Sequence, residues 1–353
     1  DEIIFKKSLY LPLRVTFIVK GKGAVTLKIK EVAKFLNTTP KALRFYEEKG
    51  LITPKKDKSN QYRDFSETDL YRLSTILALR EIGVSIRDIK TILDNPELSI
   101  TQYLDIQRSA LFEQWLEMRD MIETIDQMLE KSTESNSFEA IHQLANHLKN
   151  MKEIRNKWHD RWNFDEQAID YDDHIKKEGH IFNVHEGYDE ALALVVEKVQ
   201  LEQNSIVVDI GIGTGNLGSR FLTNGNKVIG IDQSEKMLEI CREKHPEIET
   251  RKGHFHALPL LDQSVDAIVS SYALHHLPDE EKLLALAEMI RVLKPHGQIC
   301  IADLMFADET HRKAVLEGFE KSGNRIAIDA IEDEYYADKS LLVKWIKENG
   351  YKV

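Results

Sequence analysis

Residues 207–218 are Val-Val-Asp-Ile-Gly-Ile-Gly-Thr-Gly-Asn-Leu-Gly, and this stretch decides the fold of the C-terminal half of the chain. Its apolar start predicts a buried strand, and its glycines predict a tight turn that opens a helix. The next predicted strand, residues 227–232, ends in a carboxylate, Asp232. Glycines let backbone approach a ligand, and a carboxylate at this place can accept hydrogen bonds from both hydroxyls of a ribose. The pattern therefore predicts an α/β domain with a nucleotide-binding crevice.

The spacing of the glycines bears on which nucleotide this crevice binds. Dinucleotide sites use Gly-x-Gly-x-x-Gly, which directs a helix N-terminus at a pyrophosphate. Here Gly211, Gly213 and Gly215 alternate, and Asp209 precedes them closely. A carboxylate packed under the turn would repel a pyrophosphate, but it could accept a hydrogen bond from the ammonium group of an amino-acid tail. The alternative is an ordinary strand-turn-helix without a ligand.

With Asp209 and Asp232 included, the run resembles the signature of class I S-adenosylmethionine-dependent methyltransferases, and the resemblance extends from Trp162 to the end of the chain. It implies a Rossmann-like methyltransferase domain over residues 151–353 with S-adenosylmethionine as its cofactor. The family usually has Asp at position 254 to take the adenine amino group, where this chain has a His that can offer a ring nitrogen. The resemblance implies these cofactor-binding residues: Tyr171 as a lid, Asp209, Gly211, Gly213, Gly215, Asp232, Gln233, His254, Phe255 and Ser270.

Tyr272 and His275 follow the fourth predicted strand of this domain. Substrates usually meet parallel sheets at the C-terminal ends of strands, so we predict that both side chains face the substrate. The His275–His276 pair suggests a metal site, but the nearby acids at residues 279–281 lie where they would cap the next helix. Methyl transfer from a sulfonium is an in-line displacement that needs alignment more than a metal. The sequence thus predicts no metal.

The methyl acceptor is predicted to be a small molecule. Enzymes that methylate amino groups of DNA carry an Asp/Asn-Pro-Pro-aromatic motif after the fourth strand, and the corresponding residues here are Ser-Ser-Tyr-Ala at 270–273. Enzymes that methylate cytosine C5 need a Pro-Cys nucleophile, and neither Cys241 nor Cys300 follows a proline. Both cysteines are expected to be inert, as in a reducing cytoplasm.

A second motif lies near the N-terminus. Residues 29–36 have the apolar spacing of a helix, and residues 41–49 form a second predicted helix that Gly50 ends. Thr39 is placed to cap that helix, with Pro40 at its first position. Two short helices about a short turn predict a helix-turn-helix whose second helix carries Lys41, Arg44 and Tyr46 outward. The basic loop at residues 53–63 could lie along phosphates as a wing.

Residues 43–52 together with residues 61–65 resemble the N-terminal domain of the MerR family of transcription regulators. The resemblance implies a winged helix-turn-helix over residues 27–95 that binds double-stranded promoter DNA. The family more often has Tyr at position 45 and Gly at position 61, where this chain has Phe and Gln. The residues expected to approach DNA are Lys41, Arg44, Phe45, Tyr46, Tyr62 and Arg63.

The charge is divided between the two ends of the chain. The 353 residues carry a net charge of −11, which by itself argues against nucleic acid. Residues 1–94, however, contain 19 Lys and Arg against 12 Asp and Glu, a net +7, and the remainder carries −18. A basic N-terminal part on an acidic C-terminal part is typical of a protein that contacts DNA at one end only.

A long helix is predicted between the two domains, within a linker at residues 96–150. Arg108 occupies one position of an apolar seam on this helix and weakens its start. The seam predicts a coiled coil that forms a homodimer through residues 104–129, as members of the resembled family do. A helix packed on its own domain is the alternative. The other seam residues are Leu104, Leu111, Trp115, Met118, Ile122, Ile125 and Leu129.

Both ends of the chain leave alternatives open. Residues 1–26 are an extension of unknown role, either a small added hairpin or sequence from upstream of the natural start. The resembled methyltransferases end in an antiparallel hairpin of two strands, whereas this chain stops where the sixth strand would begin. We therefore expect a sheet without its final hairpin, or a fragment. No stretch is apolar enough to span a membrane.

Taken together, the sequence predicts a multidomain α/β protein with an N-terminal, mainly helical DNA-binding domain. Its predicted function is that of a cytoplasmic transcription regulator whose C-terminal domain methylates a small molecule. Two alternatives stay open. In the first, a catalytically silent methyltransferase fold is a sensor of S-adenosylmethionine or another ligand. In the second, the chain is a methyltransferase whose helix-turn-helix is only an interaction module.

Overall fold

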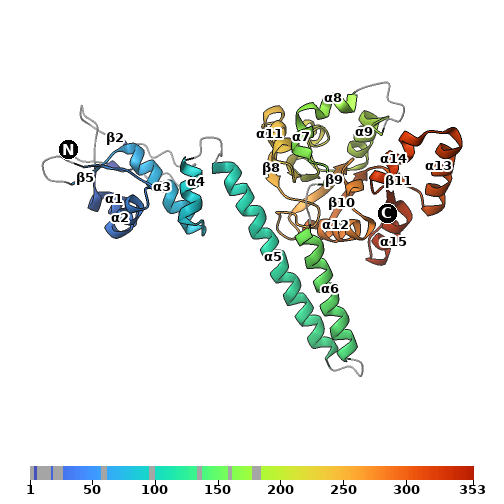
Figure 1. Cartoon of the computed structure of the whole chain (residues 1–353), viewed down its shortest axis with the longest axis horizontal. Coiled ribbons are helices and arrows are strands. Elements are labelled where there is room, and N and C mark those ends of the chain that lie inside the picture. The colour runs from blue at the N-terminus through green and yellow to red at the C-terminus, as the bar shows by residue number, and fades with distance from the viewer. Residues whose placement is uncertain are drawn as a thin grey trace. The chain divides into compact units, whose positions relative to one another are not determined.

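A computed structural model describes most of the chain. The chain forms two compact units, residues 1–103 and residues 104–353, which we describe separately. Figure 1 shows the elements of both units along the sequence. In the N-terminal extension, β1 (Ile4–Phe5) pairs antiparallel with β2 (Phe17–Ile18), and the rest of residues 1–26 lies outside the described residues. The described residues are 4–5, 17–18, 27–56, 62–94, 100–132, 137–157, 161–176 and 184–353.

The first unit contains the predicted helix-turn-helix, formed by α1 (Ile29–Phe35) and α2 (Pro40–Glu48). The Thr39 side chain accepts a hydrogen bond from the Ala42 N–H at 3.1 Å, which confirms the predicted cap. Gly50 has a φ of 71°, the left-handed conformation in which glycine commonly ends a helix. Local sequence signals thus determine both ends of the second helix.

A small antiparallel sheet and two further helices complete the first unit. Its strand order is β3-β5-β4, and residues 57–61 between β4 and β5 lie outside the described part of the chain. The apolar faces of the helices meet the sheet in one core that includes Val32, Leu43, Phe65 and Leu73. The bounds are β3 (Leu27–Lys28), β4 (Lys55–Lys56), β5 (Arg63–Phe65), α3 (Glu67–Glu81) and α4 (Ile86–Asp94).

The second unit is built on a parallel sheet with the strand order β10-β9-β6-β7-β8. The order reverses between β6 and β9, and the chain therefore leaves these two neighbouring strands in opposite directions. Such a switch point opens a crevice at the C-terminal ends of the strands. The bounds are β6 (Ile206–Ile210), β7 (Lys227–Asp232), β8 (Glu249–Lys252), β9 (Val265–Ser271) and β10 (Leu293–Ala302).

Helices cover both faces of this sheet. Val207 packs into one core with α9 (Tyr188–Lys198), α10 (Gly218–Thr223) and α11 (Glu235–Lys244). Its neighbour Val208 packs into a second core with α12 (Asp279–Val292) and α15 (Lys339–Glu348). Burial on both faces explains why the strand is continuously apolar.

The remaining short elements lie around the crevice and beside α15. Two of them, β11 and β12, pair parallel to each other in a sheet of their own. The bounds are α7 (Phe164–Gln167), η1 (Ala168–Asp170), α8 (Tyr171–Lys176), η2 (Leu274–His276), β11 (Met305–Phe306), α13 (Glu309–Ser322), α14 (Arg325–Asp333) and β12 (Ala337–Asp338).

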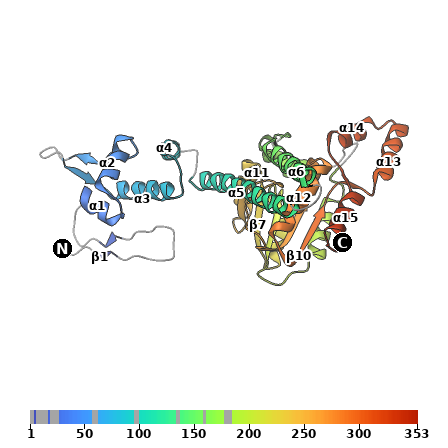
Figure 2. The same ribbon diagram turned by 90° about the horizontal axis from the view of Figure 1, so that it is seen from below.

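The linker consists of two helices, α5 (Ile100–Lys131) and α6 (Ser137–Lys157), which lie side by side in Figures 1 and 2. From residue 104 onward, α5 belongs to the second unit. Asp120 of α5 pairs with Arg155 of α6 at 2.5 Å, and Arg155 donates to the His256 carbonyl oxygen at 3.2 Å. Asp105 accepts a hydrogen bond from the Lys252 N–H at 2.7 Å. One polar face of α5 is therefore packed on its own domain, as the alternative interpretation expected.

The apolar seam lies on the other side of α5. Trp115 contacts its own domain, since the Arg291 guanidinium lies 5.2 Å from its ring centroid. The remaining six seam side chains, at positions 104, 111, 118, 122, 125 and 129, are 37–64% exposed. The helix thus has one face that is covered within the chain and one that is open.

None of the described helices combines the length with the apolar character that crossing a lipid bilayer requires.

Candidate functional site

A cavity of about 380 Å³ opens at the C-terminal ends of β6, β7 and β9, at the switch point of the sheet. The turn after β6 forms its floor. Gly211 has a φ of 71°, and a Cβ atom at this position would lie 2.5 Å from the Ala273 Cβ. Only glycine fits here. The backbone of the predicted glycine turn is therefore exposed to the cavity without side chains in between.

Asp232 lies at the edge of this floor with its carboxylate held by two backbone groups. The Gly213 N–H donates to Oδ2 and the Ser234 N–H to Oδ1, both at 2.9 Å. These bonds fix the orientation of the carboxylate, which lines the cavity. The geometry suits the predicted role, since a carboxylate held in place can accept from a pair of hydroxyl groups with little loss of conformational entropy.

Tyr171, the predicted lid, begins α8 and lies over the glycine turn. A Cβ atom at Gly213 would lie 3.7 Å from its Cε1. Burial raises the pKa of the Tyr171 hydroxyl, which therefore stays protonated at neutral pH. The next residue, Asp172, accepts hydrogen bonds from Thr214 at 2.6 Å and Asn216 at 3.0 Å. These contacts attach α8 directly to the turn after β6.

The opposite wall of the cavity includes the predicted residues Gln233, His254 and Phe255. Among the described residues, the buried Gln233 Oε1 has no hydrogen-bond donor. His254 Nδ1 accepts from the His256 N–H at 3.3 Å, and its Nε2 lies 3.5 Å from the carboxylate of Glu113 on α5. Sequence reasoning missed Glu113, because nothing near it in the chain indicates a contact with the loop after β8.

Three predicted cofactor residues do not line the cavity. The Ser270 hydroxyl donates to the Ile210 carbonyl oxygen at 2.7 Å and joins β9 to β6. Gly215 allows close packing, since a Cβ atom there would lie 2.7 Å from the His245 ring. Asp209 is 1% exposed beneath the turn. In the described structure these residues shape the turn rather than the cavity surface.

Tyr272 and His275, the predicted substrate-facing residues, both line the cavity. Tyr272 has a φ of 50°, which is uncommon for a bulky residue and marks a strained backbone. Its ring lies against His185 and Tyr188, with centroids 5.4 and 5.1 Å apart. The backbone here is held in a costly conformation that places an aromatic side chain at the end of β9.

His275 is held by Asp303, a residue that sequence reasoning missed. The ring Nδ1 lies 2.5 Å from Oδ1 of this buried carboxylate, whose Oδ2 accepts from the Leu274 N–H at 2.6 Å. Burial opposes protonation of His275, but Asp303 raises the pKa of the ring above its ordinary value. The carboxylate fixes the ring so that its Nε2 is directed away from Asp303.

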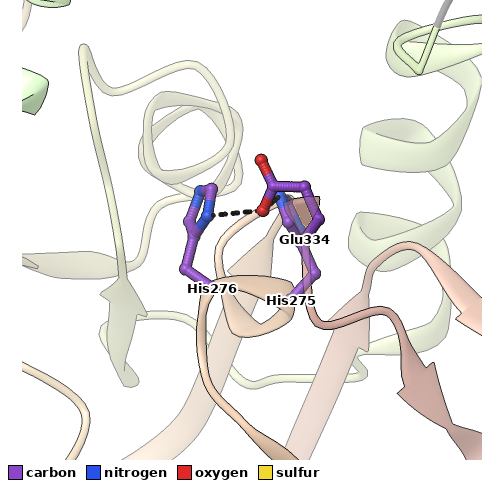
Figure 3. Close-up of side chains that lie close together, drawn as sticks. All are labelled: His275, His276 and Glu334. Carbon is purple, nitrogen blue, oxygen red and sulfur yellow. Dashed lines mark hydrogen bonds and ion pairs between the residues drawn. The ribbon is translucent and has the colours of Figure 1, made fainter. Parts of the chain in front are cut away.

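A second missed acid, Glu334, lies beside both histidines (Figure 3). Its Oε2 is 3.0 Å from His276 Nδ1 and 3.7 Å from His275 Nε2. Glu334 follows α14, 58 residues after His276 along the chain. No local pattern connects them, so only the folded chain brings this carboxylate to the histidine pair.

The predicted DNA-facing residues lie mostly on the surface of the first unit. Lys41 and Arg44 are exposed, as is Tyr62 at 64%. Arg63 of β5 forms an ion pair with Glu47 of α2. This contact joins the predicted wing to the predicted recognition helix.

The prediction that Tyr46 points outward is wrong. Its side chain is only 7% exposed and packs in the core of the first unit. Tyr46 lies three residues after the buried Leu43, so both side chains project from the same face of α2 toward the core. Phe45, one residue earlier, is 41% exposed instead.

Asp209 gives the second unit a testable pH dependence. Burial raises the pKa of its carboxyl to about 8, and the N–H of Gly218 offsets this only in part. The unfolded carboxyl ionises near pH 4, so its favourable contribution to folding is complete below about pH 4 and is lost as the pH rises to about 8. We expect Asp209→Asn to melt at a higher temperature than the parent at pH 8 and to lose most of this advantage at pH 5.

The measurement is thermal unfolding of cofactor-free protein at both pH values. Asp173→Asn is the matched control, because Asp173 is exposed on α8 and its replacement should change neither melting temperature. A difference between Asp209→Asn and the parent that is equal at pH 5 and pH 8 would contradict the assigned protonation.

Comparison with known proteins identifies one domain in each half of the chain. A family described as a methyltransferase domain matches residues 207–297, and the MerR helix-turn-helix family of regulatory proteins matches residues 27–96. An uncharacterized methyltransferase of Oceanobacillus iheyensis is 38% identical over 174 residues, which is 49% of this chain and 80% of that protein. One from Geobacillus sp. strain WCH70 is 36% identical over 199 residues, or 54% of this chain and 88% of that protein.

Among solved structures, the YcgJ protein of Bacillus subtilis is 27% identical, with a TM-score of 0.38, over 46% of this chain and 68% of its own. The assignment rests on the sequence relatives, because this chain matches most of the length of each of them at more than 30% identity. The chain belongs to the methyltransferase family, with S-adenosylmethionine as its cofactor, and it carries a MerR-type helix-turn-helix domain ahead of the methyltransferase domain.

Proposed function

We propose that this protein is a transcription regulator that binds promoter DNA through residues 27–95 and methylates a small molecule through residues 151–353. The observation that carries the proposal is that one cavity is lined both by predicted cofactor residues and by predicted substrate-facing residues. A methyl donor and its acceptor must meet in line, so the two sets have to share one enclosure.

The cofactor is placed by groups of fixed orientation. Asp232 takes the ribose hydroxyls, because its carboxylate is held at the edge of the cavity floor by two backbone N–H groups. The backbone at Gly211 and Gly213, where no side chain intervenes, would hold the amino-acid tail. Gln233 and Phe255 line the adenine end, and Tyr171 covers the turn. Tyr272 and His275 line the same cavity, so they are the residues that would hold the acceptor close to the methyl group.

The charge of the cavity supports a small acceptor rather than DNA. No Lys or Arg is found among the described residues that line it, whereas Asp232, Asp333 and Glu334 all contribute carboxylates. A polyanion would be repelled from such a surface. The cavity also lies within the acidic second unit, whereas the first unit carries a net positive charge.

A second candidate function is sensing of the cofactor, and the contacts of α5 favour it. Asp105 of α5 bonds the Lys252 N–H, and Glu113 lies near His254 in the cavity wall. A cofactor that shifts the loop after β8 therefore acts directly on the helix that leads to the DNA-binding domain. Sensing and catalysis are compatible, and product formation with a pool of metabolites distinguishes the active enzyme from a silent sensor.

We further propose that α5 forms a homodimer through residues 104–129. The polar face of the helix is already covered by its own domain, while six seam side chains are exposed. Apolar side chains at alternating spacings of three and four residues fit a second helix of the same kind. Two copies joined along this seam present two DNA-binding domains to two half-sites.

Asp232→Ala tests the cofactor assignment. Loss of the carboxylate leaves the ribose hydroxyls unpaired, and we expect S-adenosylmethionine to bind roughly 30–150-fold more weakly in calorimetry, with a milder loss for Asp232→Asn. DNA binding should be unchanged in the absence of cofactor, because the helix-turn-helix lies in the other unit. Parent-like affinity in Asp232→Ala would place the cofactor elsewhere. If the parent bound no S-adenosylmethionine at millimolar concentration, both the enzyme and the sensor proposals would be excluded.

Arg44→Ala and Arg63→Ala test the DNA-binding surface in a mobility-shift assay with the upstream region of the gene. Each should weaken binding by about 1–3 kcal/mol if the side chain contacts DNA. Arg325→Ala is the matched control, because it removes the same charge from an exposed position in the second unit. Unchanged binding in both Arg44→Ala and Arg63→Ala would exclude the assigned surface.

Ile122→Glu tests the proposed dimer. The side chain is exposed in the single chain, so a charge there should leave the fold intact but destabilise a paired seam. Sedimentation of the parent should give twice the chain mass of 40.8 kDa, and the variant should shift to the monomer at micromolar concentration. Gln127→Glu adds the same charge on α5 outside the seam and should remain dimeric. A monomeric parent would refute the proposal.

A further inference from the structure

The side chains of His275, His276 and Glu334 lie close together (Figure 3), and all three residues line the cavity. Each offers one atom that can bind a metal ion, and these three atoms lie within 4.8 Å of one another. The histidines come from η2, at the end of β9, and the carboxylate comes from the loop after α14. The three residues therefore form a cluster from two parts of the domain.

The spacing of the ligand atoms fits a tetrahedral ion. Zn²⁺ binds His nitrogen and carboxylate oxygen at about 2.0–2.2 Å, so ligand atoms around it lie about 3.3 Å apart. Here the Glu334 oxygen is 3.0 Å from His276 Nδ1 and 3.7 Å from His275 Nε2. These two distances bracket the ideal value, and the two histidine ligand atoms also lie within 4.8 Å of each other.

Asp303 supplies the second feature of a metal site. It binds His275 at Nδ1, which leaves the lone pair of Nε2 directed to the cluster. Metal-binding histidines commonly donate their other ring nitrogen to a carboxylate, which fixes the tautomer and the orientation of the ring. Asp303 is itself held by the N–H groups of Ala273 and Leu274. The ring is therefore oriented before any ion binds.

The cluster also leaves room for a further ligand. Three protein ligands on Zn²⁺ leave a fourth position for water or substrate, and all three residues here face the cavity. The Tyr336 hydroxyl lines the same cavity, and it is buried without a hydrogen-bond partner in the described part of the chain. A buried hydroxyl without a partner is unfavourable. A ligand at the fourth position would provide one.

We propose that His275, His276 and Glu334 bind a divalent transition-metal ion, for which Zn²⁺ fits best, at the acceptor end of the cavity. Imidazole nitrogen favours Zn²⁺ over Mg²⁺, which prefers oxygen ligands. The sequence predicted no metal because the nearby acids cap α12, and Asp279 does pair with Lys282 there at 3.0 Å. The third ligand comes instead from Glu334. This inference goes beyond the proposed function and does not depend on it.

The test measures metal binding by the full chain, prepared without a histidine tag and dialysed against chelator. Calorimetry with Zn²⁺ should give one ion per chain, and Co²⁺ should give the visible absorption bands of a tetrahedral site. Glu334→Gln keeps the shape of the side chain but removes its charge. Glu334→Gln and His276→Ala should each weaken Zn²⁺ binding at least about tenfold, because loss of even an indirect partner of a metal ligand lowers metal affinity by that much. Mg²⁺ should not compete.

Two controls make the result decisive. His311→Ala removes an exposed histidine from α13 and should bind Zn²⁺ like the parent. Asp232→Ala should also bind Zn²⁺ like the parent, which separates failure of the metal site from failure of the cofactor site. The proposal is overturned if the parent binds no Zn²⁺ at micromolar concentration. It is equally overturned if Glu334→Gln and His276→Ala both bind Zn²⁺ as tightly as the parent.

Discussion

The site depends on glycines at or near the C-terminal ends of three neighbouring strands, where a facing side chain packs directly against the backbone. A Cβ atom at Gly211 would lie 2.5 Å from Ala273, one at Gly230 would lie 2.3 Å from the Ile212 side chain, and one at Gly253 would lie 2.7 Å from Pro259. Real Cβ atoms do not come this close to other atoms, so a side chain at any of these positions would force the facing side chain to shift. Gly211 and Gly253 both line the cavity, so its surface at these two positions is bare backbone.

Buried acids then position the side chains that face the cavity. Asp303 lies at the end of β10, and it bonds the backbone of η2 and the His275 ring at once. A buried carboxylate is costly unless it is paired, so the arrangement is favourable only with the ring in one orientation. Asp209 pairs with no basic side chain among the described residues, and burial raises its pKa to about 8. Two acids of the same sheet are thus stabilised in opposite protonation states by their surroundings.

The helix α5 divides its contacts between its own domain and the solvent. Its buried residues are mostly polar, and Asp105 and Asp120 are satisfied by the Lys252 N–H and the Arg155 guanidinium. Eight of its fifteen exposed residues are apolar, whereas an isolated surface helix presents mainly polar residues to the solvent. Polar contacts fix the register of the helix on the domain through directional bonds. The apolar face stays available for a partner, and we propose that this partner is a second copy of the chain.

The sequence by itself determined the features that depend on residues near one another in the chain. The glycine turn with Asp232, the Thr39 cap and the end of α2 at Gly50 all follow from local rules of backbone geometry, and both domain types were predicted from such runs. The side of α2 that faces the core was not predicted correctly, because helical spacing alone leaves open which of two neighbouring side chains, Phe45 or Tyr46, points inward. The contact between His276 and Glu334 was also decided only by the tertiary structure. The two residues are 58 positions apart, the fold of the intervening segment with α13 and α14 brings them together, and no local pattern encodes that contact.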